Sequence, residues 1–220
     1  MTTNLGTEPI TRSTSDPTEL GVARAATLFE QMAVEQAVEA LEPVLAADPG
    51  TVDGWTLMAR LRLVLDQVPA ALDAANRAIG LVADHARALA TASRALTLLG
   101  KHEEAVVMAY RAVIAEPHNP LWHDRVAWAL LAADRQLADA EQAARTAIGL
   151  DPNEAHYYFT HGVALDALGH VDQARQALLT SLRMEPENPV AQHRLAVLNG
   201  EAPREPEQKK RGWKLFGRKK

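Results

Sequence analysis

Apolar residues recur at helical spacing through most of the chain. Between residues 18 and 199 they fall at i, i+3, i+4 and i+7, the pattern that predicts amphipathic helices. One copy has two such segments, at about 86–99 and 102–115, separated by Gly100 and Lys101. Glycine readily adopts the left-handed conformation that ends a helix, so Gly100 and the equivalent Gly169 mark predicted helix ends. The pattern therefore predicts a succession of helical hairpins.

The hairpin pattern repeats with a period of 34 residues, interrupted once by a spacing of 35. Five alanines define the register, and they are Ala37, Ala71, Ala105, Ala140 and Ala174. A second column of small residues precedes them by twelve or thirteen positions, and its members are Ala25, Ala59, Ser93, Ala127 and Gly162. Small side chains in both columns let two antiparallel helices pack closely, because little lies between their backbones.

The ends of the units also repeat. Twelve residues after the alanine column, four of the five units have a proline, and this column is Pro49, Ala83, Pro117, Pro152 and Pro186. These prolines are predicted to end the second helix of each unit. The pairs 119–120 and 188–189 are Asn-Pro, which predicts a helix that begins with an asparagine N-cap. The single spacing of 35 predicts a longer turn in the fourth unit, between Ala132 and Ala138.

This pattern resembles the tetratricopeptide repeat family over about residues 18–199, as five repeats and a final helix at 189–199. The family's aromatic position in the first helix is matched by Trp55 and Tyr158. Its turn and the start of its second helix are matched by GKHEEA at 100–105 and GHVDQA at 169–174, and its repeat junction by DPN at 151–153. The first unit departs from the pattern at Gly21 and Arg24. The resemblance implies an all-α, right-handed solenoid of helix pairs with a C-terminal capping helix. Accordingly, we expect a disordered arm at 1–17, the solenoid at 18–200 and a flexible basic tail at 201–220.

The resemblance also implies that the first helices line a concave groove for an extended peptide or a partner's helix. The groove positions of the family fall here on Asp53, Thr56, Arg60, Arg87, Thr91, Arg94, Asp124, Arg125, Trp128, His156, Phe159 and Asp166. The arginines predict a partner segment with acidic residues, and Trp128 and Phe159 predict an adjacent apolar anchor. The alternative is that the arginines are ordinary solvated positions and that Trp128 packs between repeats. The carboxylate clamp of chaperone-binding repeats is not expected, because its positions hold Thr56, Arg60, Arg87 and Thr91.

Composition narrows the class of protein. Aromatic residues make up 5% of a chain that is 47% apolar, so its core is predicted to consist of closely packed helices. The absence of cysteine excludes disulfides and thiolate chemistry. The first 20 residues have neither the basic nor the apolar region of an export signal, and no apolar run reaches about 18 residues. A cytoplasmic location is therefore expected.

The net charge of −5 is unevenly distributed. Residues 201–220 have eight bases and three acids, which leaves a net −10 on residues 1–200. The predicted docking residues of the tail are Lys209, Lys210, Arg211, Trp213, Lys214, Leu215, Phe216, Arg218, Lys219 and Lys220. Basic residues interleaved with Trp, Leu and Phe suit an anionic membrane surface, here the inner face of the membrane. Docking on another protein, contact with nucleic acid, a solubilising role and coverage of a helix face of the same chain are the alternatives.

Nothing in the sequence predicts catalysis. The phosphate-binding, dinucleotide-binding, esterase and zinc-protease motifs are absent. Ser93 and Ser181 lie in columns of small packing residues. His156 and His161 are five residues apart, so they fall on different faces of a helix and do not predict a shared metal site. No catalytic residue, metal or cofactor is therefore predicted.

The sequence thus predicts a non-enzymatic adaptor for protein–protein interaction, with a groove for the partner and a tail for docking. The alternative is a peripheral membrane scaffold whose repeats self-associate. A nucleic-acid-associated regulator is disfavoured, because the acidic body would repel phosphates. The identity of the partner and the oligomeric state are left open by the sequence.

Overall fold

The computed structural model describes residues 16–202, which form eleven α-helices and contain no strand. The predicted all-α fold is thereby confirmed. The helices are α1 Pro17–Glu30, α2 Val34–Ala47, α3 Val52–Val64, α4 Val68–Leu81, α5 Ala86–Leu98, α6 His102–Ala115, α7 Pro120–Ala133, α8 Leu137–Leu150, α9 Ala155–Ala167, α10 Val171–Met184 and α11 Pro189–Asn199. The predicted arm and tail residues fall largely outside the described range.

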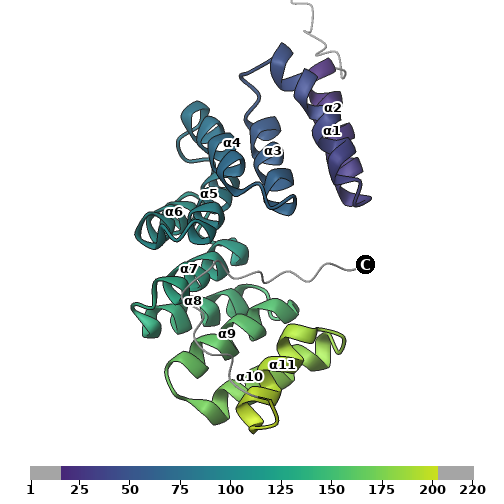
Figure 1. The fold of residues 1–220 in the computed structure, drawn as a ribbon. Helices are drawn as coiled ribbons and strands as arrows, with labels where there is room; N and C mark the ends of the chain where they lie inside the picture. The colour runs from purple at the N-terminus through teal and green to yellow at the C-terminus, as the bar shows by residue number, and fades with distance from the viewer. Residues whose placement is uncertain (1–15, 203–220) are drawn as a thin grey trace, which may run out of the picture.

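Each helix packs against the next one in the chain, so the helices form five antiparallel pairs and a final single helix. Figure 1 shows this order, with α1 and α2 at one end of the molecule and α10 and α11 at the other. Among the helices of residues 16–202, none returns to pack against the opposite end. Such a stack buries its core only between neighbouring units, as in a solenoid.

The stack is curved towards its first helices. Consecutive first helices contact one another throughout the series α1, α3, α5, α7 and α9, whereas consecutive second helices make no comparable contact among the described residues. The row formed by the first helices is therefore the tighter one. We call this side the concave face and the side of α2, α4, α6, α8 and α10 the convex face.

The two columns of small residues lie at the interfaces within the pairs. Their alanines and Ser93 are completely buried. Gly162, in α9, shows why small size is needed: a Cβ there would lie 2.9 Å from Leu178 Cγ and 3.2 Å from the Ala174 carbonyl oxygen. The interpretation of these columns as packing positions is confirmed.

The junctions between units share one hydrogen bond. At four junctions, a side chain in the first turns of the next helix reaches back to the carbonyl oxygen of the proline six residues earlier. Trp55 Nε1 and Tyr158 Oη donate to Pro49 and Pro152 over 2.8 and 3.2 Å. His123 and Gln192 occupy the equivalent places at Pro117 and Pro186. The predicted caps also form, because Asn119 and Asn188 accept from the backbone N–H groups that follow.

One detail of the fourth unit corrects a prediction. Its turn, residues 134–136, is no longer than the turn at 99–101 in the preceding unit. The extra residue instead extends α7, which has 14 residues where α5 has 13. The chain then reverses through two residues with positive φ, Asp134 at 53° and Gln136 at 49°. The other turns have one such residue, as at Gly100 and Gly169.

Candidate functional site

The concave face displays most of the predicted groove residues and buries four of them, Thr56, Thr91, Asp124 and Phe159. Arg60 and Arg87 are exposed, and Arg94, Arg125, Trp128 and His156 are partly exposed. Thr56, Thr91 and Phe159 are only 2%, 7% and 4% exposed. The Thr56 and Thr91 hydroxyls donate to helix carbonyl oxygens, at Val52 and Arg87 respectively. These three residues therefore support the face from beneath and offer a partner little surface.

Arg60, Arg94 and Trp128 occupy the same position in successive first helices. Each follows directly after a member of the small column, at Ala59, Ser93 and Ala127. Because α3, α5 and α7 lie side by side, these three side chains form a row across the concave face. The row changes from cationic to aromatic toward the C-terminal end of the solenoid.

Arg60, Arg87, Arg94 and Arg125 form what we call the arginine cluster. Burial and the charge of Arg87 lower the pKa of Arg60. Burial, together with the charges of Arg125 and Arg60, lowers the pKa of Arg94 to about 10. Burial also lowers the pKa of Arg125, and the nearby Asp124 opposes this effect. The positive charges of the cluster therefore act unfavourably on one another.

Three arginines of the cluster, Arg60, Arg87 and Arg125, form no close ion pair with a described carboxylate. Among residues 16–202, no carboxylate lies within 4.0 Å of the guanidinium nitrogens of Arg60, Arg87 or Arg125. Arg60 instead lies over the ring of Phe29, with its guanidinium carbon 5.1 Å from the ring centroid. Glu116 has a lowered pKa, mainly because Trp122 and Asn119 donate hydrogen bonds to it, and Arg87 contributes by its charge. Two described carboxylates that act electrostatically on arginines of the cluster are Glu116, coupled to Arg87, and Asp124, coupled to Arg125.

Trp128, His156 and Phe159 form an aromatic cluster beside the arginines. The ring centroids of Trp128 and His156 are 6.1 Å apart with the planes inclined by 23°, and Phe159 lies 6.0 Å from Trp128. Phe159 belongs to the buried core around α9 and α10, against which Trp128 also packs. Trp128 thus packs between repeats, as the alternative interpretation held, while part of its surface remains accessible. It therefore offers a rigid apolar surface.

A buried carboxylate lies beneath the aromatic cluster. Asp124, 3% exposed, accepts a hydrogen bond of 2.6 Å from the Thr160 hydroxyl. Its other oxygen lies 3.3 Å from His156 Nε2, and Trp128 Nε1 lies 3.3 Å from the same nitrogen. Burial alone would lower the pKa of His156, but the charge and hydrogen bond of Asp124 outweigh it and raise this pKa. Protonated His156 would donate to Asp124, whereas the neutral ring with a free Nε2 would accept from Trp128.

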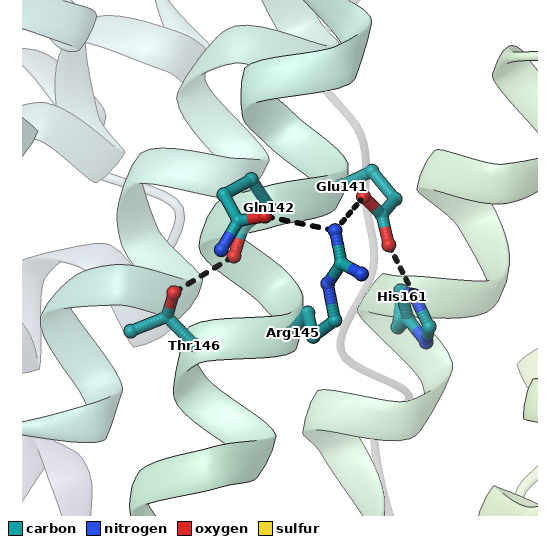
Figure 2. Close-up of polar contacts among 5 residues, drawn as sticks. All are labelled: Glu141, Gln142, Arg145, Thr146 and His161. Carbon is teal, nitrogen blue, oxygen red and sulfur yellow. Dashed lines mark hydrogen bonds and ion pairs between the residues drawn. The ribbon is translucent and has the colours of Figure 1, made fainter.

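The convex face has a polar network that sequence reasoning did not find. Glu141 accepts from His161 Nε2 at 2.8 Å and from Arg145 at 3.0 Å, and Arg145 also donates to Gln142 (Figure 2). Glu141 and Arg145 of α8 and His161 of α9 line a hollow of about 520 Å³, together with Tyr158 and residues of α10. Glu141 and His161 are twenty residues apart on different helices, and no local motif joins them. His156 and His161 thus lie on different faces of α9, as predicted.

The described residues include no group of three or more His, Asp or Glu side chains arranged to hold a metal ion. Ser93 and Ser181 are fully buried, in agreement with their interpretation as packing residues. Within residues 16–202, every helix is too short or too polar to span a bilayer.

Asp166, the last of the predicted groove residues, lies 3.7 Å from Arg194 of α11. The predicted tail-docking residues, from Lys209 to Lys220, lie outside the described residues.

Comparison with known proteins was made for both sequence and fold. Residues 155–188, which contain α9 and α10, match a family model described as tetratricopeptide repeat. The sequence matches none of the curated proteins with which it was compared.

Several solved structures share the fold. A thermophilic TPR protein of Thermus thermophilus has a TM-score of 0.71 at 16% identity, covering 83% of this chain and 98% of that chain. PilF of Pseudomonas aeruginosa has a TM-score of 0.69 at 17% identity, covering 84% and 85%. YrrB, described as a TPR protein with an unusual peptide-binding site, has a TM-score of 0.59 at 17% identity, covering 79% and 89%. At such identities, the likeness concerns the fold alone.

Proposed function

We propose that this chain, which is a tetratricopeptide repeat protein, is a non-enzymatic adaptor that binds a segment of a partner protein in a groove on its concave face. The fold is that of protein-binding scaffolds, and YrrB, which shares it, is described as having a peptide-binding site. The observation that carries the proposal is the arginine cluster next to the aromatic cluster on one face of α3, α5, α7 and α9. Fold analogy alone would not select that face.

The chemistry of the face suggests the character of the partner segment. Guanidinium groups bind carboxylates and phosphates through paired hydrogen bonds, and the cluster lies in a body of net negative charge. Trp128 offers an apolar surface on the C-terminal side of the arginines. The segment would therefore carry acidic groups next to a bulky apolar residue. Its direct contacts would be Arg60, Arg87, Arg94, Arg125, Trp128 and His156, while Thr56, Thr91 and Phe159 hold these side chains in place.

A pull-down tests the groove. The protein without its tail, residues 1–208, is incubated with native lysate and cross-linked to the proteins it binds. A variant of the same length with Arg94→Glu and Trp128→Ala is treated in parallel. Reversal of one charge and loss of the apolar surface are expected to abolish capture of the partner, with the helical circular dichroism retained. Since Trp128 contributes to packing, Arg60→Glu with Arg87→Glu provides a second variant at exposed positions. Normal capture by both folded variants would refute the groove.

For the tail we propose a separate role, weak and reversible docking to an anionic membrane surface at the inner face of the membrane. The support is its sequence, in which seven bases surround Trp213, Leu215 and Phe216. Each base near such a surface contributes about 1 kcal/mol before losses from ordering. Truncation to residues 1–208 should abolish salt-dependent sedimentation with phosphatidylserine-containing liposomes. Equal sedimentation of both forms would exclude this role.

Self-association of the solenoid at the membrane is the alternative to an adaptor. Light scattering over a series of protein concentrations separates the two. An adaptor keeps one molar mass over the series, whereas a self-associating scaffold increases in mass with concentration.

A further inference from the structure

We infer that an apolar patch on helix α6, on the convex face, is a docking site for the basic and aromatic tail of the same chain. This goes beyond the proposed function, because it gives the tail a binding surface on the protein itself. The membrane role proposed above uses the same tail residues, so the two surfaces would compete for them. The patch consists of Val107, Tyr110 and Ile114 along α6, with Leu81 of α4 and Leu150 of α8 beside its C-terminal end.

The patch is an exception on the convex face. Val107, Tyr110 and Ile114 lie at i, i+3 and i+7 of α6 and are 55%, 39% and 79% exposed. The other second helices have mainly polar or very small residues at the same repeat positions, which are Glu39, Glu42 and Ala46, Asp73, Asn76 and Gly80, Gln142, Arg145 and Gly149, and Gln176, Leu179 and Arg183. Single exposed apolar residues are ordinary, but three on one face of one helix indicate an interaction surface.

The Ile114 end of the patch is open on both sides. Gly80 of α4 and Gly149 of α8 occupy the same repeat position as Ile114 on the neighbouring second helices. A Cβ at either glycine would meet nothing within 4 Å. A bulky apolar side chain could therefore lie against Ile114 without displacing a neighbour.

The Val107 end is acidic. Asp73 occupies the repeat position of Val107 on α4, and Asp139 lies in the first turn of α8. Among the described residues, no Lys, Arg or His nitrogen lies within 4.0 Å of either of these two carboxylates. The glutamates in the first turn of α6 already have basic partners. The charge at this end thus favours a cationic segment.

The tail has the complementary chemistry in the matching order. Residues 209–220 contain seven bases and no acid, around Trp213, Leu215 and Phe216. In extended form, residues 213–216 span about 10 Å, and the rise of α6 from Val107 to Ile114 is also about 10 Å. With the three bases at 209–211 beside the acidic end, the apolar side chains that follow would lie along the patch.

The position of α11 brings the start of the tail to the same edge of the molecule. Asn199, the last residue of α11, accepts a hydrogen bond of 3.0 Å from Arg175, which also donates to Asp172 in the first turn of α10. The tail therefore begins at the edge where the second helices begin. Passage across α8 to α6 requires about two helix diameters, or about 20–24 Å, whereas ten extended residues such as 203–212 reach about 33 Å. Docking within one molecule is favoured, because the tethered tail has a high effective concentration.

A fluorescent label beside the patch tests this inference, and the absence of native cysteine allows its placement. The full-length protein with Gly149→Cys is labelled with bimane, a fluorophore that tryptophan quenches on contact. Trp213→Phe removes the quencher and keeps an aromatic ring. Val107→Ser/Ile114→Ser removes the patch, and Leu179→Ser is the matched control at an exposed convex position of α10. Circular dichroism verifies that each variant is folded.

Docking predicts a loss of quenching in Trp213→Phe and an equal loss in Val107→Ser/Ile114→Ser, with none in Leu179→Ser. Dilution of the protein should not change the quenching, because the tail and the patch belong to one molecule. Equal fluorescence of the parent protein and Trp213→Phe would overturn the inference and leave the groove and the membrane role standing. Quenching by Trp213 that survives loss of the patch would also overturn it. Quenching that disappears on dilution would do the same, since the tail would then bind another copy.

Discussion

Helix α9 contributes the histidine to two histidine–carboxylate pairs, one on each face of the molecule. The two pairs differ in their burial and in their hydrogen-bond partners. On the concave side, His156 lies 3.3 Å from Asp124 of α7, whose side chain is 4% exposed. On the convex side, His161 lies 2.8 Å from Glu141 of α8, whose side chain is 15% exposed. Asp124 also accepts a hydrogen bond from the Thr160 hydroxyl, while Glu141 also forms an ion pair with Arg145.

The comparison shows that the burial and further contacts of a histidine–carboxylate pair determine its effect on the structure more than the residue types that form it. Glu141 belongs to a network along α8 with an exposed arginine, so water can replace each contact at small cost (Figure 2). Asp124 is enclosed between two helices, and its histidine also contacts Trp128 on the proposed binding surface. A change in the concave pair therefore reaches the aromatic cluster, whereas a change in the convex pair remains local.

Removal of the two carboxylates should give the largest difference. Asp124→Ala removes the buried carboxylate that accepts from Thr160 and pairs with His156, and it should lower the free energy of unfolding by about 3 kcal/mol. Glu141→Ala is the matched control and should cost about 1 kcal/mol or less. Urea titrations followed by circular dichroism measure both. Equal losses would show that the two pairs do not differ in the way described.

Two glycines extend the contrast to the packing of these helices. Gly162→Ala places a Cβ 2.9 Å from Leu178 Cγ, inside the α9–α10 interface, and should cost about 1–3 kcal/mol. Gly149→Ala, near the exposed end of α8, meets nothing within 4 Å. That change should stabilise the protein by about 0.5–1 kcal/mol, because alanine favours the helix. Thermal melts of the two variants should shift in opposite directions, and a gain in stability for Gly162→Ala would contradict the packing argument.

A smaller effect is expected from pH. The pKa of His156 is raised above its ordinary value of 6.5 by Asp124, against the opposing effects of burial and of Arg125. The stabilisation from this pair is therefore fully present below the ordinary pKa and is lost as the pH rises through the folded-state value. His156→Gln should destabilise the protein more at about pH 6 than at about pH 8. Asp124→Asn should remove this pH dependence, and its persistence in that variant would assign it to another group.

Much of the fold was predictable because each unit repeats the same local constraints. Buried alanines such as Ala71 and Ala105 mark the helix interfaces, and Asn119 and Asn188 mark helix starts. These signals are local, so they can be recognised without knowledge of the neighbouring units. The register of the concave face followed from the same period, which aligned Arg60, Arg94 and Trp128.

The parts that could not be predicted depend on contacts between units. Thr56, Thr91 and Phe159 occupy groove positions in the repeat pattern, but their side chains are buried in the packed stack. The pairing of Glu141 with His161 likewise arises only when α8 and α9 are packed together. The extra residue of the fourth unit was located in the sequence, but its effect, a longer α7, depended on the backbone geometry of the turn.

The most direct test of the account compares equal charge reversals on the two faces. Once the partner segment is identified, its Kd is measured for the wild-type protein, for the concave variant Arg60→Glu/Arg94→Glu and for the convex variant Arg145→Glu/Arg183→Glu. Both variants change the net charge by the same amount, so nonspecific attraction affects them equally. The account predicts that the concave variant weakens binding at least about 100-fold while the convex variant stays within about threefold of the wild type. Equal weakening by both variants, or a greater loss on the convex face, would contradict it.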